Sequence, residues 1–360
     1  MQTVVYFNQW ISSISLVLED LKNKFGDNIK IIASSRNKNH VYKNYVDEFI
    51  VEDWEEVENN NALSMKNYVD FVLNLCKEKN VNIFFVKKHS LEIAKAAGSF
   101  ERLGIVLVQE NIDTINTIEN KSLTYDIIKN KMKDYSWLIP DYINTSNVKE
   151  LINFIESKHK NNCEICLKFN TDEGGASFRH IVDNRPTIHS LYNYRVNEIS
   201  TTETYEMLMK NIREVDRLIL MDMLDSPEIS VDCYNSKNGF IAICREKVEG
   251  RVERIFYNNE IAEICRKIGE VFNLKYIYNV QFRRVHGYKE KYKNNEIDSL
   301  RLLEVNPRMS GGVYMVAAYD MNLAEILLFD IFNDNDKYTM DKFRDFEDKY
   351  VTHLELPVKL

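Results

Sequence analysis

Residues 302–312 read Leu-Leu-Glu-Val-Asn-Pro-Arg-Met-Ser-Gly-Gly, an apolar strand pattern that runs into a polar turn. Side chains alternate between the two faces of a strand, so Glu304 and Asn306 share one face. Their carboxylate and amide oxygens are hard ligands that suit Mg²⁺. Pro307 has no N–H for pairing and ends the strand, and Arg308 offers a guanidinium suited to a phosphoryl or carboxylate oxygen. The stretch predicts a metal and phosphate site; the competing interpretation is a plain charged strand end with a Gly-Gly turn.

A second strand pattern lies at residues 276–285. Its polar and apolar residues alternate: Asn279, Gln281 and Arg283 on one face, Val280 and Phe282 on the other. A charged, loop-like segment, 286–298, joins it to the strand at 300–306. We therefore predict a long hairpin in which the Gln281 amide faces the two oxygen ligands of the first strand.

Composition excludes several classes of protein. The chain has 360 residues, enough for two or three domains, and a net charge of −8, which argues against a nucleic-acid partner. It has no run of about 18 apolar residues, so no membrane span is expected. The N-terminus lacks the pattern of a signal peptide, and six scattered cysteines suit a reducing compartment. We predict a cytoplasmic protein with neither a nucleic-acid nor a membrane partner.

Strand and helix patterns alternate over the first 112 residues, which predicts a small doubly wound α/β domain. The expected strands are 3–7, 29–33, 46–51, 82–86 and 105–108, and the expected helices are 12–25, 66–79 and 91–100. A dinucleotide site would need a Gly-rich turn after the first strand, but residues 8–13 contain no glycine. Asn8 and Ser12 stand where a small ligand could be contacted, although a serine there equally suits a helix cap.

Residues 163–169 form a further strand pattern that contains Lys168 and leads into a turn with Gly174 and Gly175. A glycine pair after a strand lets backbone N–H groups approach phosphates, and a lysine supplies a point charge. No Gly-Lys-Ser/Thr follows, so the turn is not a Walker A loop. An ordinary Gly-Gly hairpin is the competing interpretation.

With these pieces in order, the chain resembles the ATP-grasp superfamily, its carbamoyl-phosphate-synthase-like branch, and the ATP-grasp proteins encoded with tellurite-resistance-type (Ter) operons. The resemblance covers about residues 1–330. It implies an α/β fold, with α+β character in the catalytic part. The implied segments are a Rossmann-like pre-ATP-grasp domain (1–112), a lid subdomain (113–200), a catalytic subdomain (201–335) and a C-terminal tail (336–360).

The resemblance also implies residues that bind ATP. Lys121 on the first lid helix and Lys168 would contact phosphates, and Glu228 would hold the ribose hydroxyls. The lid loop would be Glu173, Gly174, Gly175, Ala176 and Ser177, and the hinge that hydrogen-bonds adenine would be Asp222, Met223 and Leu224. Two features depart from the family pattern: Met221 stands where a glutamate usually begins the hinge, and the lid loop has only two glycines.

The implied metal ligands are Gln281, Glu304 and Asn306, which would hold Mg²⁺, with Mn²⁺ as an alternative. Arg308 matches an arginine near the transferred phosphate or the acceptor carboxylate, and Arg245 resembles a substrate-side arginine. Both are therefore expected to be catalytic.

The activity implied by the resemblance is a ligase that uses ATP to activate a carboxylate as an acyl-phosphate for attack by an amine. Its partners would be ATP, a small carboxylate and a small amine, and a homodimer is left open. Two alternatives remain: a kinase acting on bicarbonate or carbamate, and a nucleotide-binding regulatory protein without turnover. The fold does not fix the acceptor, so the substrates cannot be identified from the sequence.

Overall fold

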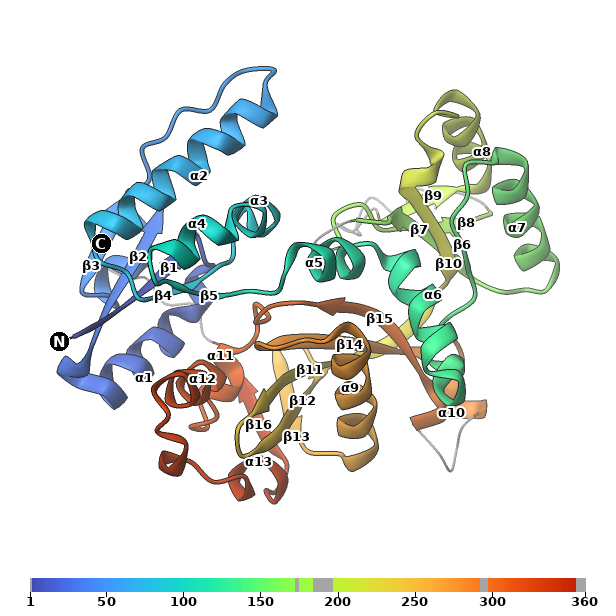
Figure 1. Ribbon diagram of the computed structural model, residues 1–360. Helices are drawn as coiled ribbons and strands as arrows, with labels where there is room; N and C mark the ends of the chain where they lie inside the picture. The colour runs from blue at the N-terminus through green and yellow to red at the C-terminus, as the bar shows by residue number, and fades with distance from the viewer. Residues whose placement is uncertain (1, 172–174, 184–196, 292–296, 354–360) are drawn as a thin grey trace. The chain divides into compact units, whose positions relative to one another are not determined.

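The structure is a computed structural model that describes residues 2–171, 175–183, 197–291 and 297–353 (Figure 1). These residues form three β-sheets, one parallel and two built largely from antiparallel pairs. The mixed α/β architecture agrees with the fold class expected from the sequence. Every helix in these described ranges is too short or too polar to span a bilayer.

The N-terminal sheet has the strand order β3-β2-β1-β4-β5, and all its pairs are parallel. Along β1, Val5 and Phe7 pack into a core with α1, while Tyr6 packs into a second core with α2. The two helices therefore cover opposite faces, as Figure 1 shows, and the predicted doubly wound α/β arrangement of these strands and helices is confirmed. The elements are β1 (Thr3–Asn8), α1 (Ser15–Phe25), β2 (Ile29–Ser35), β3 (Glu48–Val51), α2 (Asn61–Glu78), β4 (Ile83–Phe85), α3 (Ser90–Lys95), α4 (Ala97–Arg102) and β5 (Val106–Val108).

A second five-stranded sheet has the order β6-β10-β7-β8-β9. Its apolar face packs against two helices, α7 and α8, through residues such as Ile165 and Leu167. The elements are α5 (Ile112–Glu119), α6 (Lys121–Lys131), β6 (Tyr142–Ile143), α7 (Val148–Lys160), β7 (Ile165–Phe169), β8 (Arg179–Val182), β9 (Glu198–Ser200), α8 (Thr201–Lys210) and β10 (Leu218–Asp222).

The third sheet has the order β15-β14-β11-β12-β13-β16. The neighbouring strands β14 and β15 confirm the hairpin predicted from the sequence. The C-terminal tail, where no element was predicted, contributes β16, a short and polar edge strand that pairs with β13. The elements are β11 (Leu224–Ser236), β12 (Gly239–Glu249), β13 (Val252–Phe256), α9 (Asn259–Phe272), β14 (Tyr278–Val285), α10 (Tyr288–Lys291), β15 (Leu300–Asn306), α11 (Tyr314–Ala317), α12 (Leu323–Phe332), α13 (Asp341–Arg344) and β16 (Lys349–Thr352).

The chain divides into two compact units. The first unit contains residues 1–116, 230–280 and 306–360, and the second contains residues 117–229 and 281–305. A continuous apolar core in the first unit joins α1 and β1 to α12. The boundaries of these two units differ from those of the four segments expected from the sequence. Residues 230–280 and the C-terminal tail belong to the same unit as the N-terminal sheet.

Candidate active site

The position of Lys168 follows from the alternation of side chains between the two faces of strand β7. Ile165 and Leu167 pack into the apolar core under α7 and α8, so Lys168 lies on the opposite face of the sheet. It stands opposite Ile219 of β10 and is only 5% exposed. A lysine is rarely buried to this extent without an anionic group nearby.

Asn170, which directly follows β7, holds the first turn of α6 beside this strand. Its backbone carbonyl accepts the N–H of Lys121 at 3.1 Å, and its side-chain oxygen accepts the N–H of Ser122 at 2.8 Å. Its amide group also donates to the N-cap Asn120 at 2.9 Å. These bonds place Lys121, itself 5% exposed, in the same unit and beside the same strand end as Lys168.

Tyr125 joins α6 to strand β15. Its hydroxyl lies one helical turn after Lys121 and donates to the backbone carbonyls of Leu303, at 2.8 Å, and Leu302, at 3.1 Å. The contact brings the Lys121 ammonium to 3.9 Å from the carboxylate of Glu304. The sequence predicted the lysines and the glutamate, but neither Tyr125 nor Asn170, because neither residue type signals such a long-range contact.

The electrostatics of this cluster favour an anion. Burial, and secondarily the neighbouring charge of Lys121, lower the pKa of Lys168 from 10.5 to about 8. Glu304 and Cys166 act in the opposite direction, and Arg283 adds to the positive charge. A phosphate placed here would favour the charged form of Lys168 and restore its ordinary pKa.

We expect the affinity for ATP to fall as the pH rises above about 8, where free Lys168 loses its proton. Binding a phosphate must then take up a proton, so Kd should rise by up to about tenfold per pH unit. Titration calorimetry between pH 7 and pH 9.5 measures this profile. Lys168→Arg keeps its charge over this range and should flatten the profile; an equally steep profile in that variant would contradict the assignment.

Without nucleotide, the contribution of Lys168 to the free energy of unfolding should rise with pH, whereas the affinity for ATP should fall. The unfolded chain keeps the Lys168 proton up to about pH 10.5, whereas the folded chain releases it near pH 8. The unfolded state therefore binds more protons in this window, and stability contributed by this group rises with pH.

An apolar cluster adjoins Lys168 in the second unit. Its buried members are Cys166, Met221 and Leu224, and its partly buried members are Tyr142, Phe178, Met223 and Leu303. Cys166 and Lys168 share one face of β7, and Met221 pairs with Cys166. Side chains of this kind suit the flat faces of a nucleobase.

Two backbone N–H groups of the predicted hinge already form hydrogen bonds within the second five-stranded sheet. The N–H groups of Asp222 and Met223 donate to the carbonyls of Asp141, at 2.9 Å, and Glu164, at 2.8 Å. The Asp222 carboxylate forms an ion pair with Lys158 at 2.5 Å. These two amides are therefore used within the second five-stranded sheet, and adenine recognition through the hinge stays a prediction.

Glu228, predicted to hold the ribose, lies on β11 and forms an ion pair with Arg283 of β14 at 3.3 Å. The sequence placed Arg283 on the polar face of its strand but assigned it no role. Because Arg283 also raises the positive potential at Lys168, it belongs with the candidate site.

The predicted lid loop is described only in part, because Glu173 and Gly174 lie outside the described residues. Gly175 has a φ of +68°, which favours glycine. The hydroxyl of Ser177 accepts the N–H of Phe169 at 2.7 Å, and the Ala176 carbonyl accepts from Arg179 at 3.4 Å. These contacts are those of a β-hairpin turn, and phosphate binding by the loop stays a prediction.

The donor set predicted for the metal, one carboxylate and two amide oxygens, suits Mg²⁺, and metal binding by these residues stays a prediction. Gln281 and Glu304 lie on the neighbouring strands β14 and β15, and Asn306 is the last residue of β15. Across the described ranges, no three His, Cys, Asp or Glu residues gather into a metal cluster. One carboxylate with amide oxygens suits Mg²⁺, which usually keeps several waters and binds substrate phosphates.

The two arginines predicted to be catalytic both belong to the first unit. Arg308 is half-buried and donates to the Met309 carbonyl at 3.1 Å. Arg245 is 4% exposed, and its guanidinium contacts four side chains: Asp232 and Glu253 at 2.7 Å, Ser310 at 2.9 Å and Ser230 at 3.0 Å. A guanidinium engaged in this way is suited to position the loop at Ser310, and direct contact with a substrate stays a prediction.

Gly312→Ala is expected to destabilise the chain by about 1–3 kcal/mol, because the added methyl has no room. A Cβ there would lie 2.4 Å from Nη1 of Arg245, which its buried partners hold in place. Gly311→Ala is the matched control, since its Cβ would meet only the end of the Ile11 side chain, at 2.9 Å. Urea unfolding compares the two; an equal loss in both variants would contradict the role assigned to Arg245.

Residues 214–354, less than half of the chain, match a family model described as ATP-grasp in the biosynthetic pathway with Ter operon. A search of the curated proteins found no match.

Several solved structures share the fold. The biotin carboxylase domain of Hydrogenobacter thermophilus 2-oxoglutarate carboxylase, a dimer bound to MgADP, ADP and bicarbonate, gives a TM-score of 0.63 at 15% identity, over 97% of this chain and 74% of that chain. The L-amino acid ligase from Bacillus licheniformis gives a TM-score of 0.61 at 12% identity, over 95% of this chain and 77% of that chain. Rhizobium etli pyruvate carboxylase gives a TM-score of 0.59 at 15% identity, over 92% of this chain but only 28% of that chain. At these identities the likeness establishes the fold.

Proposed function

Because the chain has the ATP-grasp fold, we propose that it is an ATP- and Mg²⁺-dependent ligase that activates a carboxylate and joins it to an amine. The observation that carries the proposal is the buried pair Lys121 and Lys168 beside the Glu304 carboxylate. The Glu304 carboxylate supplies one negative charge beside these two buried ammonium groups, and a triphosphate would supply several more. The apolar cluster around Met221 offers a surface for the base, and Glu228 offers a carboxylate for the ribose.

The roles follow from the chemistry of phosphoryl transfer. A carboxylate oxygen attacks the γ-phosphorus, the bond to the ADP oxygen breaks, and an acyl-phosphate forms. Lys121 and Lys168 hold the phosphates and offset the charge that accumulates on them. Glu304, with the amide oxygens of Gln281 and Asn306, would hold Mg²⁺, which supplies further positive charge at the phosphate oxygens.

In the second step the amine nitrogen attacks the carbonyl carbon of the acyl-phosphate. A C–N bond forms, inorganic phosphate leaves with the electron pair of the broken C–O bond, and the amine releases its proton. Acyl-phosphates are open to hydrolysis, so closure of the predicted lid loop would serve to exclude water. Arg308 is proposed to bind the acceptor carboxylate.

The test is ADP release across a panel of organic carboxylates and amines, with bicarbonate in a separate arm. The proposal expects ADP and phosphate only when a cognate carboxylate is present, and an amide product only when its amine is added. ADP formation with bicarbonate alone would favour a kinase, and tight Mg-ATP binding with no turnover for any pair would favour a regulatory protein. Either result would overturn the ligase assignment.

A further inference from the structure

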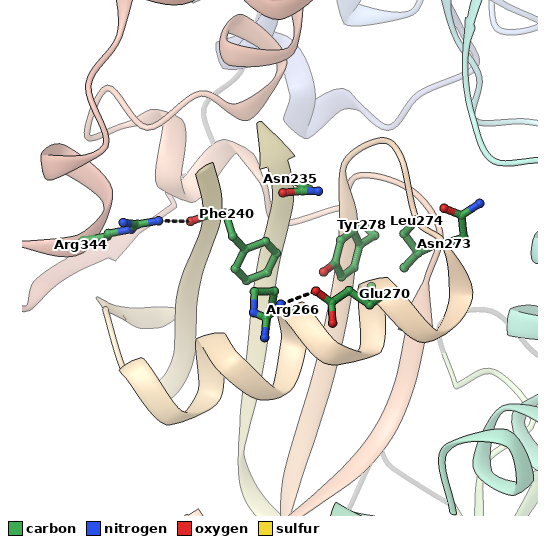
Figure 2. A pocket seen from close by; sticks show the side chains of 9 residues that line it. Asn235, Phe240, Arg266, Glu270, Asn273, Leu274, Tyr278 and Arg344 are labelled. Carbon is green, nitrogen blue, oxygen red and sulfur yellow. Dashed lines mark hydrogen bonds and ion pairs between the residues drawn. The ribbon is translucent and has the colours of Figure 1, made fainter. Parts of the chain in front are cut away.

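The hollow drawn in Figure 2, of about 390 Å³, contains an arginine whose charge is balanced. It is bordered by α9, and its lining includes Phe240, Arg266 and Glu270. Arg266 is paired with Glu270, as Figure 2 shows, and with Glu263 of the same helix. Two carboxylates offset one guanidinium, so this hollow gives no reason to expect an anionic ligand.

Arg283 of β14 is balanced less completely. Its Nη2 donates to Oε2 of Glu228 at 3.3 Å, which is long for a charged hydrogen bond. Its Nε is buried and has no hydrogen-bond partner in the part of the chain that the structure describes. The Nε of Arg254 is unpartnered in the same sense, but Glu246 and Asp348 balance the charge of that guanidinium. Because buried donors are almost always satisfied by protein, water or a bound molecule, Arg283 has room for a further acceptor.

The guanidinium of Arg283 also lies among the cations of the candidate active site. Its charge and that of Lys121 both lower the pKa of Lys168. Burial raises the pKa of the Cys166 thiol, and Lys168 and Arg283 act in the opposite direction. Cys166 and Lys168 share one face of β7. Three cations from α6, β7 and β14 therefore act on one region of the second unit, which favours a ligand with several negative charges.

The alternation of β14 relates Arg283 to the predicted metal site. Gln281 and Arg283 lie on the same face of this strand, about 7 Å apart, and the buried Phe282 lies on the other. Gln281 is one of the predicted Mg²⁺ ligands, and a protein-bound Mg²⁺ usually binds substrate phosphates as well. A long side chain two residues further along that face is placed to contact the same run of phosphates.

We propose that Arg283 is a third phosphate-binding cation of this site, which donates to a phosphate oxygen through N–H groups that Glu228 does not engage. A guanidinium presents parallel N–H groups along its edges, which matches the oxygens of a phosphate. The proposal rests on the ATP site proposed above, but it does not depend on the ligase chemistry.

The experiment is titration calorimetry of the full chain with Mg-ATP, with inorganic Mg-triphosphate and with adenosine, in wild type and in Arg283→Gln. The glutamine amide can still donate to Glu228 but carries no charge. Mg-ATP and Mg-triphosphate should each bind at least about tenfold more weakly to the variant, the effect of losing a charged hydrogen bond. Adenosine should bind to both proteins with the same affinity. Unchanged affinity for Mg-ATP in folded Arg283→Gln, or an equal loss for adenosine, would overturn the proposal.

Two further variants separate the role of Arg283 from a general effect of charge. Arg283→Lys keeps the charge but loses the planar fork, so it should bind Mg-ATP more tightly than Arg283→Gln and more weakly than wild type. Arg301→Gln is the control, because Arg301 is a half-buried arginine of the same unit that donates to the carbonyls of Asp298 and Leu300. It should leave every affinity unchanged, and a loss equal to that of Arg283→Gln would contradict a specific contact.

The outcomes also distinguish this proposal from the proposed function. Mg-ATP binding that depends on Arg283, with no ADP release for any substrate pair, would reject the ligase function alone. ADP release that is unchanged in Arg283→Gln at ATP concentrations below saturation would reject the role of Arg283 alone. No binding of Mg-ATP or Mg-triphosphate by folded wild type would overturn both.

Discussion

Glu304→Gln should reduce ADP formation by at least about a hundredfold while the fold is retained. The change removes the one carboxylate among the three predicted metal ligands, and groups that stabilise charge in the transition state are commonly worth that much. Gln has nearly the same volume as Glu, and the residue is half-buried rather than enclosed in the core. The measurement is steady-state ADP release at saturating Mg-ATP with the cognate substrates, beside a thermal melt of each variant.

The control is the next residue on the same strand. Val305 is buried on the opposite face of β15, so Val305→Ala should lower the free energy of unfolding by about 1–3 kcal/mol. It should leave turnover nearly intact at temperatures where the variant is folded. Near-normal turnover in Glu304→Gln would mean that Glu304 is not a metal ligand.

Arg245→Met is expected to lower the free energy of unfolding by about 3–5 kcal/mol, the usual cost of removing one partner from a buried ion pair. Asp232 is fully buried, and it would lose the guanidinium that lies 2.7 Å away. Glu253 would lose the same partner. Urea unfolding measures the loss, with the slope checked to ensure that the transition stays two-state.

Neutralising the two carboxylates as well distinguishes the two possible causes of the lost stability, unpaired buried charge and lost packing. In the triple variant Arg245→Met, Asp232→Asn and Glu253→Gln, no buried charge is left unpaired, so most of the lost stability should return. A triple variant that is as unstable as Arg245→Met would attribute the effect to lost packing and would contradict the ion-pair explanation.

The residues that belong to periodic patterns were predictable from the sequence. Strand alternation alone places Lys168 on the face opposite Ile165 and Leu167. It likewise places Glu304 and Val305 on opposite faces of their strand. The hairpin of β14 and β15 was predictable for the same reason. In each case the information lies within a few neighbouring residues, where the geometry of a strand determines which side chains share a face.

Contacts between distant segments were not predictable in this way. Tyr125 reaches carbonyls 177 and 178 residues away, and Asn170 joins the end of β7 to the start of α6. The burial of Arg245 depends on how β11, β12 and β13 align, which the sequence pattern of β12 alone does not reveal. The tail strand β16 is too short and too polar to be recognised before its partner β13 is known.

The measurement that tests nucleotide binding at the lysine pair most directly is the melting temperature with and without millimolar Mg-ATP, in wild type and in Lys168→Met. Lys210→Met, which removes an exposed lysine from the same unit, is the control. Wild type and control should rise by at least about 2 °C on adding Mg-ATP. Lys168→Met should start at an equal or higher temperature, because a poorly solvated charge is gone, and should not rise. No rise in folded wild type, or an equal rise in Lys168→Met, would contradict nucleotide binding at this site.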